Sequence, residues 1–404
     1  MPSLDALRFA PWLTRKRLMR WSGAFVLMTA ILVAAHIATH TAVGLTNKSG
    51  EQFGVDFIDF WSGARFAESG HPVEAYDPGA VDAFQKSVVG SAEAQFKYYN
   101  YPPVAMMLSL PLARLPFLWA LVAWVGLGAG FCLWSLSRLL GWRIAALATF
   151  GAPAACLNLL TGQNGYFTAG LLGTGLMVLD RRPVLAGILF GLLSYKPHLG
   201  LLLPVALIAG GYWRAVIAAT ATVVLLLVGS TVLFGIDIWP AFLRIMVLQR
   251  HMMEISTWAW HRIPTVFIAV RIAGGGVGAA YAAQIASAAV AVVIVVQVWR
   301  ARCALELKAA TLVIAMFVSL PYAQDYDMVV LIFAAGWMLN QALVSGFLPW
   351  ERLTLAMLLI LPFVAMPLSK WTGVQIGPIV LWAALASVVR RAVPVRATLS
   401  SAAL

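Results

Sequence analysis

Long apolar stretches separated by short basic turns make up most of this chain. Several carry no Lys, Arg, Asp or Glu and exceed the roughly 20 apolar residues that a membrane-spanning helix needs. These uncharged stretches are 21–47, 115–137, 215–236, 272–299 and 328–350. Following the apolar segments in order predicts an all-α integral membrane protein with about twelve crossings. Four expected helices, over 144–160, 165–180, 184–195 and 197–211, are short for a bilayer, which indicates an interrupted bundle around a cavity.

The turns between these segments predict the orientation. Lys and Arg collect in cytoplasmic loops, and a basic group, including Arg15 and Arg20, precedes the first apolar stretch. We therefore expect both termini inside and two outer loops, 45–101 and 235–262, within a single transmembrane domain spanning 1–404. A plasma-membrane (inner-membrane) protein with its chemistry on the exterior or periplasmic face is the expected location.

Composition supports the membrane assignment and excludes other classes. The 404 residues are 61% hydrophobic and only 11% charged, whereas soluble domains are about one quarter charged. The net charge of +12 follows from the basic turns, and no segment interleaves bases with stacking aromatics, so no nucleic-acid partner is expected. The three cysteines have no metal-ligand or disulfide spacing.

Acidic residues concentrate in the first outer loop. Eight of the sixteen acids lie between Glu51 and Glu93. Asp56 and Asp59 begin a segment whose apolar residues recur at i, i+3, i+4 and i+7 and therefore share one helix face. A second surface helix is expected to start at Pro78 with Asp77 as its N-cap. Both helices are too short to span, so we expect amphipathic interfacial helices in this loop.

Asp56 and Asp59 are the candidate catalytic residues. One carboxylate could act as a general base facing a cavity at the membrane surface, and enclosure by the neighbouring Phe57, Phe60 and Trp61 would raise its pKa. The alternative is that Asp56 only caps the helix and Asp59 only points to water. No metal is expected, because the three-residue spacing without histidines forms no ligand cage.

Lys196 is the only Lys, Arg, Asp or Glu in the 27 residues from Pro183 to Ala209. A charge within such a segment is costly and is a functional candidate for that reason. It is expected to contact an anion, most plausibly the phosphate of a lipid, with His198 assisting. The alternative is a simple turn favoured by Pro197.

Further candidates flank the apolar segments at the same expected face. In the second outer loop, Arg262 could hold a phosphate while aromatic rings stack on a sugar; a solvated loop is the alternative. Turn formation or helix capping would equally explain several of the others. The residues expected to bind the sugar or the acceptor are Tyr101, Gln163, Asn164, Trp258, Trp260, His261, Asp325 and Asp327.

Nucleotide and hydrolase signatures are absent from the sequence. There is no Walker loop, GxSxG elbow, HExxH motif or dinucleotide fingerprint, and Gly274-Gly275-Gly276 lacks the strand and lysine of a nucleotide loop. Acids and lipid-level cations gathered at one face favour a reaction on a lipid-borne substrate.

Five segments resemble glycosyltransferase family 87, whose GT-C-type members include polyprenyl-phosphate-mannose-dependent mannosyltransferases. They occur in the family order and span most of the chain. The segments are GVDFIDFWSGARFAESGHPVEAYD (54–77), YNYPPVAMMLSLPLARLP (99–116), LTGQNGYFTAGLL (160–172), LAGILFGLLSYKPHLGLLLPVAL (185–207) and, more loosely, PYAQDYDMVVL (321–331).

The resemblance implies a GT-C membrane fold whose first outer loop supplies a catalytic aspartate, matched here by Asp56. It also implies a hexosyltransferase that moves a sugar, expected to be mannose, from a polyprenyl phosphate to a lipid-linked or cell-envelope glycan with inversion. The donor lipid is then a co-substrate and no cofactor is expected. A transporter or lipid flippase remains the alternative, because short interrupted helices and a mid-segment lysine also suit alternating access. A non-catalytic assembly scaffold would leave the acid cluster unexplained.

Overall fold

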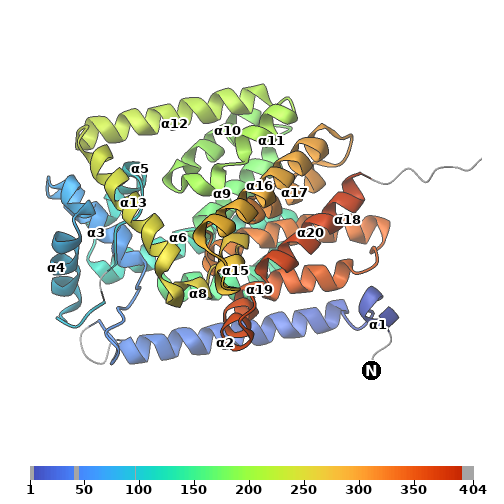
Figure 1. Ribbon diagram of the computed structural model, residues 1–404, viewed down its shortest axis with the longest axis horizontal. Helices are drawn as coiled ribbons and strands as arrows, with labels where there is room; N and C mark the ends of the chain where they lie inside the picture. Colours follow the sequence, from blue (N-terminus) through green and yellow to red (C-terminus); the bar gives the residue numbers. More distant parts are fainter. Residues whose placement is uncertain (1–3, 41–44, 96, 394–404) are drawn as a thin grey trace, which may run out of the picture.

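The computed structural model describes residues 4–40, 45–95 and 97–393. These residues form helices joined by short turns, and their only β pairing is an isolated bridge between Thr46 and Gln52. Most of the helix axes run along the long dimension of the molecule (Figure 1). The expected all-helical class is confirmed. Both chain termini, whose side of the membrane the sequence predicts, lie outside the described residues.

Six helices are long and apolar enough to cross a membrane. They are α2 (Arg15–His40), α6 (Phe117–Leu140), α12 (Trp213–Phe234), α16 (Val277–Arg300), the continuous segment Asp325–Ser345, which comprises η4 (Asp325–Val330) and α18 (Leu331–Ser345), and α19 (Glu351–Thr372). A bent pair raises the number to seven if it forms one span. By length and composition the described residues therefore contain fewer spans than the twelve that hydropathy predicts, although the protein is a helical membrane protein.

The bent pair replaces the single helix expected over 144–160. The chain forms α7 (Trp142–Gly151) and α8 (Pro153–Thr161), whose axes differ by 60°. Proline at position 153 lacks the amide hydrogen that would continue the helix, and its ring would clash with the preceding turn. Ala152 accordingly adopts an extended conformation, and it interrupts the single helix that the sequence predicts over 144–160.

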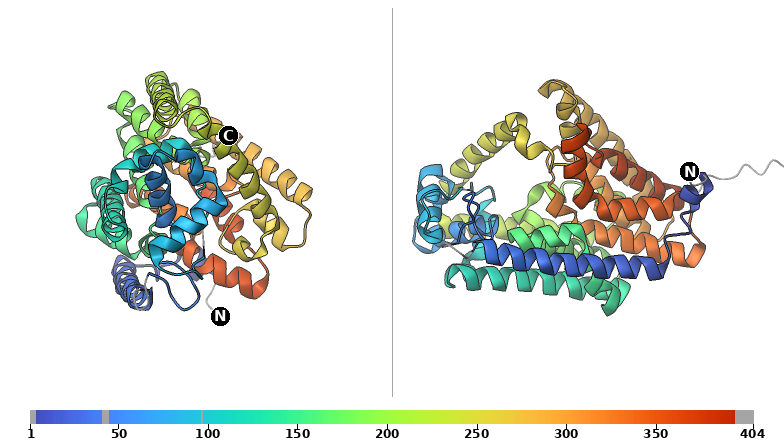
Figure 2. Two further views of the ribbon diagram at one scale, coloured as in Figure 1. Left: turned by 90° about the vertical axis from the view of Figure 1, so that its left-hand side faces the viewer. Right: turned by 90° about the horizontal axis from the view of Figure 1, so that it is seen from below.

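The remaining helices are shorter, and several occupy the middle of the bundle (Figure 2). In α9 (Gly165–Val178) eleven of fourteen residues are buried, whereas α2 buries only two. Helix α9 thus packs inside the bundle, whereas α2 lies on its outside. The other short elements of the bundle are α5 (Pro103–Ala113), α10 (Pro183–Leu192), η2 (Leu193–Tyr195), η3 (Pro197–Gly200), α11 (Leu203–Ala209), α17 (Leu305–Ser319) and α20 (Gly377–Ala392).

One end of the bundle carries the first polar loop, and we call it the α4 end (Figure 1). It holds α3 (Phe57–Glu68), η1 (Pro72–Tyr76) and α4 (Pro78–Val89). The start of α4 is confirmed, because the Asp77 side chain accepts a bond from the Ala80 amide at 2.8 Å. Helix α3 is less superficial than expected, since nine of its twelve residues are buried.

The opposite end carries α1 (Leu4–Phe9), and we call it the α1 end. The turn before α19 contacts α1 there, because the Trp350 amide donates to the Arg8 carbonyl. A buried ion pair between Arg391 and Glu351 lies at the same end.

The segment expected as the second outer loop is mostly helical. Residues 235–262 contain α13 (Ile238–Ile255) and α14 (Thr257–Trp260), so this segment, like the first polar loop, is built mainly of helices. Helix α13 has an apolar stripe whose buried members recur at i, i+3 or i+4, as Ile238, Ala241 and Ile245 do, and this spacing is helical. Helix α15 (Val266–Ile272) follows and is capped by the Thr265 hydroxyl.

Candidate active site

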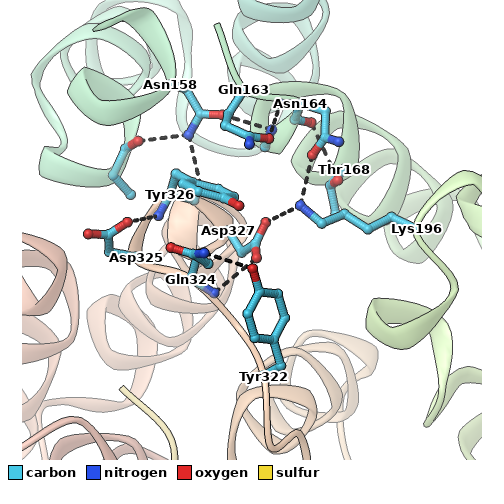
Figure 3. A network of polar contacts seen from close by, with 12 residues as sticks. Asn158, Gln163, Asn164, Thr168, Lys196, Tyr322, Gln324, Asp325, Tyr326 and Asp327 are labelled. Carbon is cyan, nitrogen blue, oxygen red and sulfur yellow. Dashed lines mark hydrogen bonds and ion pairs between the residues drawn. The ribbon is translucent and has the colours of Figure 1, made fainter. Parts of the chain in front are cut away.

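Two aspartates of η4 each hold a cation from a distant segment. The Asp325 carboxylate accepts two bonds at 3.0 Å from the Arg262 guanidinium, donated by Nε and Nη2. The Asp327 carboxylate pairs with Lys196 Nζ at 2.5 Å (Figure 3). The Arg262 side chain keeps 30% of its surface exposed, whereas the Lys196 side chain keeps 4%. A ligand can therefore reach Arg262 more easily than Lys196.

The turn between α8 and α9 lies against this pair of aspartates. Asn164 Oδ1 accepts from Lys196 Nζ at 2.9 Å, and Gln163 Oε1 accepts from the Tyr101 hydroxyl at 3.3 Å. Asn158 joins the turn to η4, because its amide donates to the Tyr326 carbonyl at 2.8 Å and its oxygen accepts from the Gly165 amide at 2.7 Å. Figure 3 shows the α8–α9 turn, Lys196 and η4 brought together by these contacts.

Asp56 is held beside the same turn by its backbone. Its amide donates to the Thr161 carbonyl at 3.0 Å. The chain can approach so closely because position 162 is glycine: a Cβ there would lie 2.5 Å from the Phe57 Cβ, and φ is +71°. Only glycine adopts that conformation without strain. The start of α3 is thus fixed next to Gln163 and Asn164.

The Asp56 carboxylate does not cap α3. Asp56 occupies the N-cap position but accepts no capping bond, and none of the ion pairs among the described residues involves it. Burial alone would lower the pKa of Arg262, but Asp325 and, further away, Asp56 raise it above its usual value. The half-buried Asp56 therefore lies within electrostatic reach of Arg262 without being neutralised by a contact.

Asp59 has different surroundings. It keeps only 7% of its surface exposed, and its nearest polar contact is a long bond of 3.5 Å from Gln85 on α4. Burial, followed by the negative charge of Asp56, raises the pKa of Asp59 well above its usual range. Asp59 therefore points into the packed interior of the α4 end, and the alternative that it only points to water is wrong.

A model of glycosyltransferase family 87 matches residues 99–321, which is more than half of the chain. No curated protein and no solved structure matches the chain. The chain belongs to glycosyltransferase family 87. This family membership confirms the resemblance and favours a glycosyltransferase over a transporter or a scaffold. Tyr101, Gln163, Asn164, Lys196 and Arg262 lie within the matched part.

The ion pairs of Asp325 and Asp327 with Arg262 and Lys196, together with the α8–α9 turn, form one polar cluster. The other predicted site residues of this family 87 glycosyltransferase lie around it. His261 precedes Arg262, and its Nδ1 contacts the Ser369 hydroxyl of α19 at 2.9 Å. His198 lies edge-on to the Tyr322 ring, with 6.3 Å between ring centroids. Among the described residues its buried Nε2 has no hydrogen-bond partner, so a ligand group could bind there.

The two tryptophans in residues 235–262 of this glycosyltransferase have different environments. Trp258 is 70% exposed, and Trp260 is 8% exposed. The Trp260 indole donates to the Met253 carbonyl at 2.8 Å, and the Arg271 guanidinium lies 4.9 Å from its ring centroid. Both ring surface and N–H of Trp260 are thus engaged by protein, which leaves Trp258 as the ring available for stacking.

Sequence reasoning missed several residues of the cluster. Asn158, Tyr322, Gln324 and Tyr326 all take part in its bonds. Asn158 had a usable signal, since it is a lone amide within the apolar stretch 144–160 and buried amides need partners. Among the described residues no group of three or more His, Cys, Asp or Glu side chains could hold a metal ion.

Proposed function

We propose that this protein transfers a hexose, mannose, from a polyprenyl-phosphate donor to a lipid-linked or cell-envelope glycan, with inversion at the anomeric carbon. One observation carries the proposal. Asp56 offers a half-buried carboxylate without a capping bond, next to the polar α8–α9 turn and within electrostatic reach of Arg262. A base within electrostatic reach of a phosphate-binding cation is what displacement at a phosphate-linked sugar requires.

Asp56 acts as the general base in this proposal. It takes the proton of an acceptor hydroxyl, whose oxygen attacks C1 of the sugar from the side opposite the phosphate. The new C1–O bond forms as the bond from C1 to the phosphate oxygen breaks, and its electron pair leaves with the polyprenyl phosphate. General-base catalysis of this kind contributes about 10²–10⁴-fold to the rate.

Arg262 is the proposed contact for the donor phosphate. Its Nε and Nη2 hold Asp325. Among the residues that the structure describes, Nη1 donates to no protein group, so it can donate to a phosphate oxygen from a partly exposed side chain. The pair with Asp325 fixes the guanidinium plane before the donor arrives. A fixed donor directed at a developing negative charge typically lowers the barrier by about 3 kcal/mol.

Sugar and acceptor hydroxyls are assigned to polar groups at and near the α8–α9 turn. Gln163, Asn164 and Tyr101 offer amide and phenol groups, and His198 and His261 flank them. Trp258 supplies an exposed ring on which a sugar can stack. The proposal places the reaction at the exterior face of the plasma membrane, because the α4 end carries the acidic loop and the α1 end carries most of the basic turns.

Incubation of the purified protein with synthetic short-chain polyprenyl-phosphate mannose and an envelope lipid extract, followed by mass spectrometry, tests the proposal. We expect a mannosylated lipid or glycan and free polyprenyl phosphate. Polyprenyl-phosphate arabinose and a nucleotide-linked mannose serve as competing donors. Consumption of the nucleotide sugar alone, or equal turnover by the Asp56→Asn variant, would exclude the proposed mechanism.

A further inference from the structure

Lys196 is enclosed by protein groups and has little room for a ligand. The residue is 3% exposed. Its ammonium donates to Asn164 Oδ1 at 2.9 Å and to Asp327 Oδ1 at 2.5 Å, and the centroid of the Tyr326 ring lies 5.1 Å away. A lysine ammonium has three donors, and two of them are used. This geometry suits a structural counter-ion better than a phosphate contact.

The partner of Lys196 controls how η4 is held. Asp327 Oδ2 accepts from the Gln324 amide at 3.1 Å, which closes the first turn of η4 as part of a capping box. Asp325, two residues before Asp327, forms an ion pair with the Arg262 guanidinium. The Asp325 amide also donates to the Arg262 carbonyl at 3.2 Å. A shift of η4 would therefore move the carboxylate that orients Arg262.

The charge of Asp327 makes this link depend on Lys196. Asp327 has no exposed surface, and a buried carboxylate deprived of its counter-ion is strongly destabilised. Loss of Lys196 would leave Asp327 either to take up a proton or to turn toward water, and both outcomes release η4.

We infer that Lys196 is a positioning residue of glycosyl transfer, which holds η4 through Asp327 so that Asp325 presents Arg262 to the donor phosphate. The inference rests on the proposed function and assigns Lys196 a role different from the direct phosphate contact expected from the sequence. Lys196 acts through Asp327 and Arg262, and its positive charge is needed only because Asp327 is negative.

A neutral pair that keeps the hydrogen bonds separates the two roles. In the double variant Lys196→Gln/Asp327→Asn, the new glutamine can donate to Asn164 and accept from the new asparagine, whose oxygen still accepts from the Gln324 amide. Lys196→Gln alone should lower kcat/KM for the donor by about 10²-fold, the cost of a misplaced catalytic group. The double variant should recover to within about fivefold of the wild type with an unchanged donor KM, since bonds between neutral groups can replace a buried ion pair.

The ion pair at the α1 end provides a matched control. Arg391 and Glu351 are likewise buried but lie far from the site, so Glu351→Gln should lower the unfolding temperature and leave kcat/KM unchanged. A double variant as impaired as Lys196→Gln, with a raised donor KM, would show that Lys196 binds the phosphate and would overturn the inference. Absence of turnover by the wild type would instead overturn the proposed function, and this inference with it.

Discussion

Asp56 and Asp59 stand three residues apart on one helix, yet their carboxylates have different environments. Asp59 points toward Gln85 and the interior, whereas Asp56 stays half-buried and accepts no capping bond. A residue chosen from the sequence as a candidate cap thus performs no capping in the structure. This difference makes Asp56 the stronger candidate for the base and permits a clean test of its role.

Asp56→Asn should leave folding unchanged and lower turnover by at least about 10²-fold, because the amide keeps the shape of the side chain and removes only its basicity. Turnover of purified protein with a polyprenyl-phosphate sugar and the unfolding temperature in detergent measure the two effects. Asp77, which does cap a helix, is the matched control: Asn caps about as well as Asp, so Asp77→Asn should change neither. Normal turnover by Asp56→Asn would move the base elsewhere.

Asp59 should make stability depend on pH. The pKa of Asp59 is raised in the folded protein by burial and then by Asp56, so the folded state binds this proton more tightly than the unfolded chain. Its contribution is present at low pH and is lost as pH rises through the raised pKa. Asp59→Asn removes this dependence.

We therefore expect the unfolding temperature of Asp59→Asn to exceed that of the wild type by a margin that widens as the pH rises above about 4, the ordinary pKa of an aspartate. Turnover should fall less than in Asp56→Asn. Parallel pH profiles for the two proteins would show that the Asp59 carboxyl is not held protonated by its surroundings.

At the scale of elements, the contact between the start of α3 and the α8–α9 turn positions Asp56. That contact depends on Gly162, which has a φ of +71°. A Cβ at this position would lie 2.5 Å from the Phe57 Cβ, so there is no room for a side chain. Gly162→Ala should cost about 1–2 kcal/mol for the left-handed conformation and about 1–3 kcal/mol for overpacking. Displacement of α3 should also lower kcat.

Gly90 is the control for that substitution. It has nearly the same φ, +70°, but a Cβ there would meet nothing within 4 Å. Gly90→Ala should therefore show only the cost of the left-handed conformation, with kcat unchanged. Equal effects of the two substitutions on kcat would mean that the approach of the α8–α9 turn does not position Asp56.

At the scale of the whole molecule, charge is distributed unequally between the two ends. The acidic first loop lies at the α4 end, and basic residues gather at the turns toward the α1 end. From this asymmetry we predict that the α1 end is cytoplasmic. The basic residues in question are Arg15, Lys16, Arg17, Arg20, Arg138, Arg143, Arg181, Arg182, Arg300, Arg302, Arg390 and Arg391.

Cysteine labelling in intact cells checks this orientation. In a cysteine-free background, Ala92→Cys at the α4 end should react with a membrane-impermeant thiol reagent, and Ser345→Cys at the α1 end should react only after the cells are opened. Both positions are exposed, so burial does not explain a difference. The reverse pattern would place the proposed site in the cytoplasm.

The sequence by itself determined the membrane class, the long helices and the start of α4. Uncharged stretches of about 20 residues satisfy their backbone bonds within one helix, so α6, α12 and α16 follow from local composition. Asp77 and Pro78 likewise act within one turn. These features depend on neighbours in the chain, and a single sequence contains that information.

Only the tertiary structure decided which candidates meet and what each contacts. Lys196 and Asp327 are 131 residues apart, and Arg262 and Asp325 are 63 apart. Their pairing therefore depends on how the η2–η3 turn, η4 and the turn after α14 pack. The same packing buries Trp260 and leaves Trp258 exposed. Hydropathy predicts which segments lie in the membrane but not which segments they pack against, because many arrangements of apolar helices bury similar surface. The polar contacts then select one arrangement, since an unpaired charge inside it would be too costly.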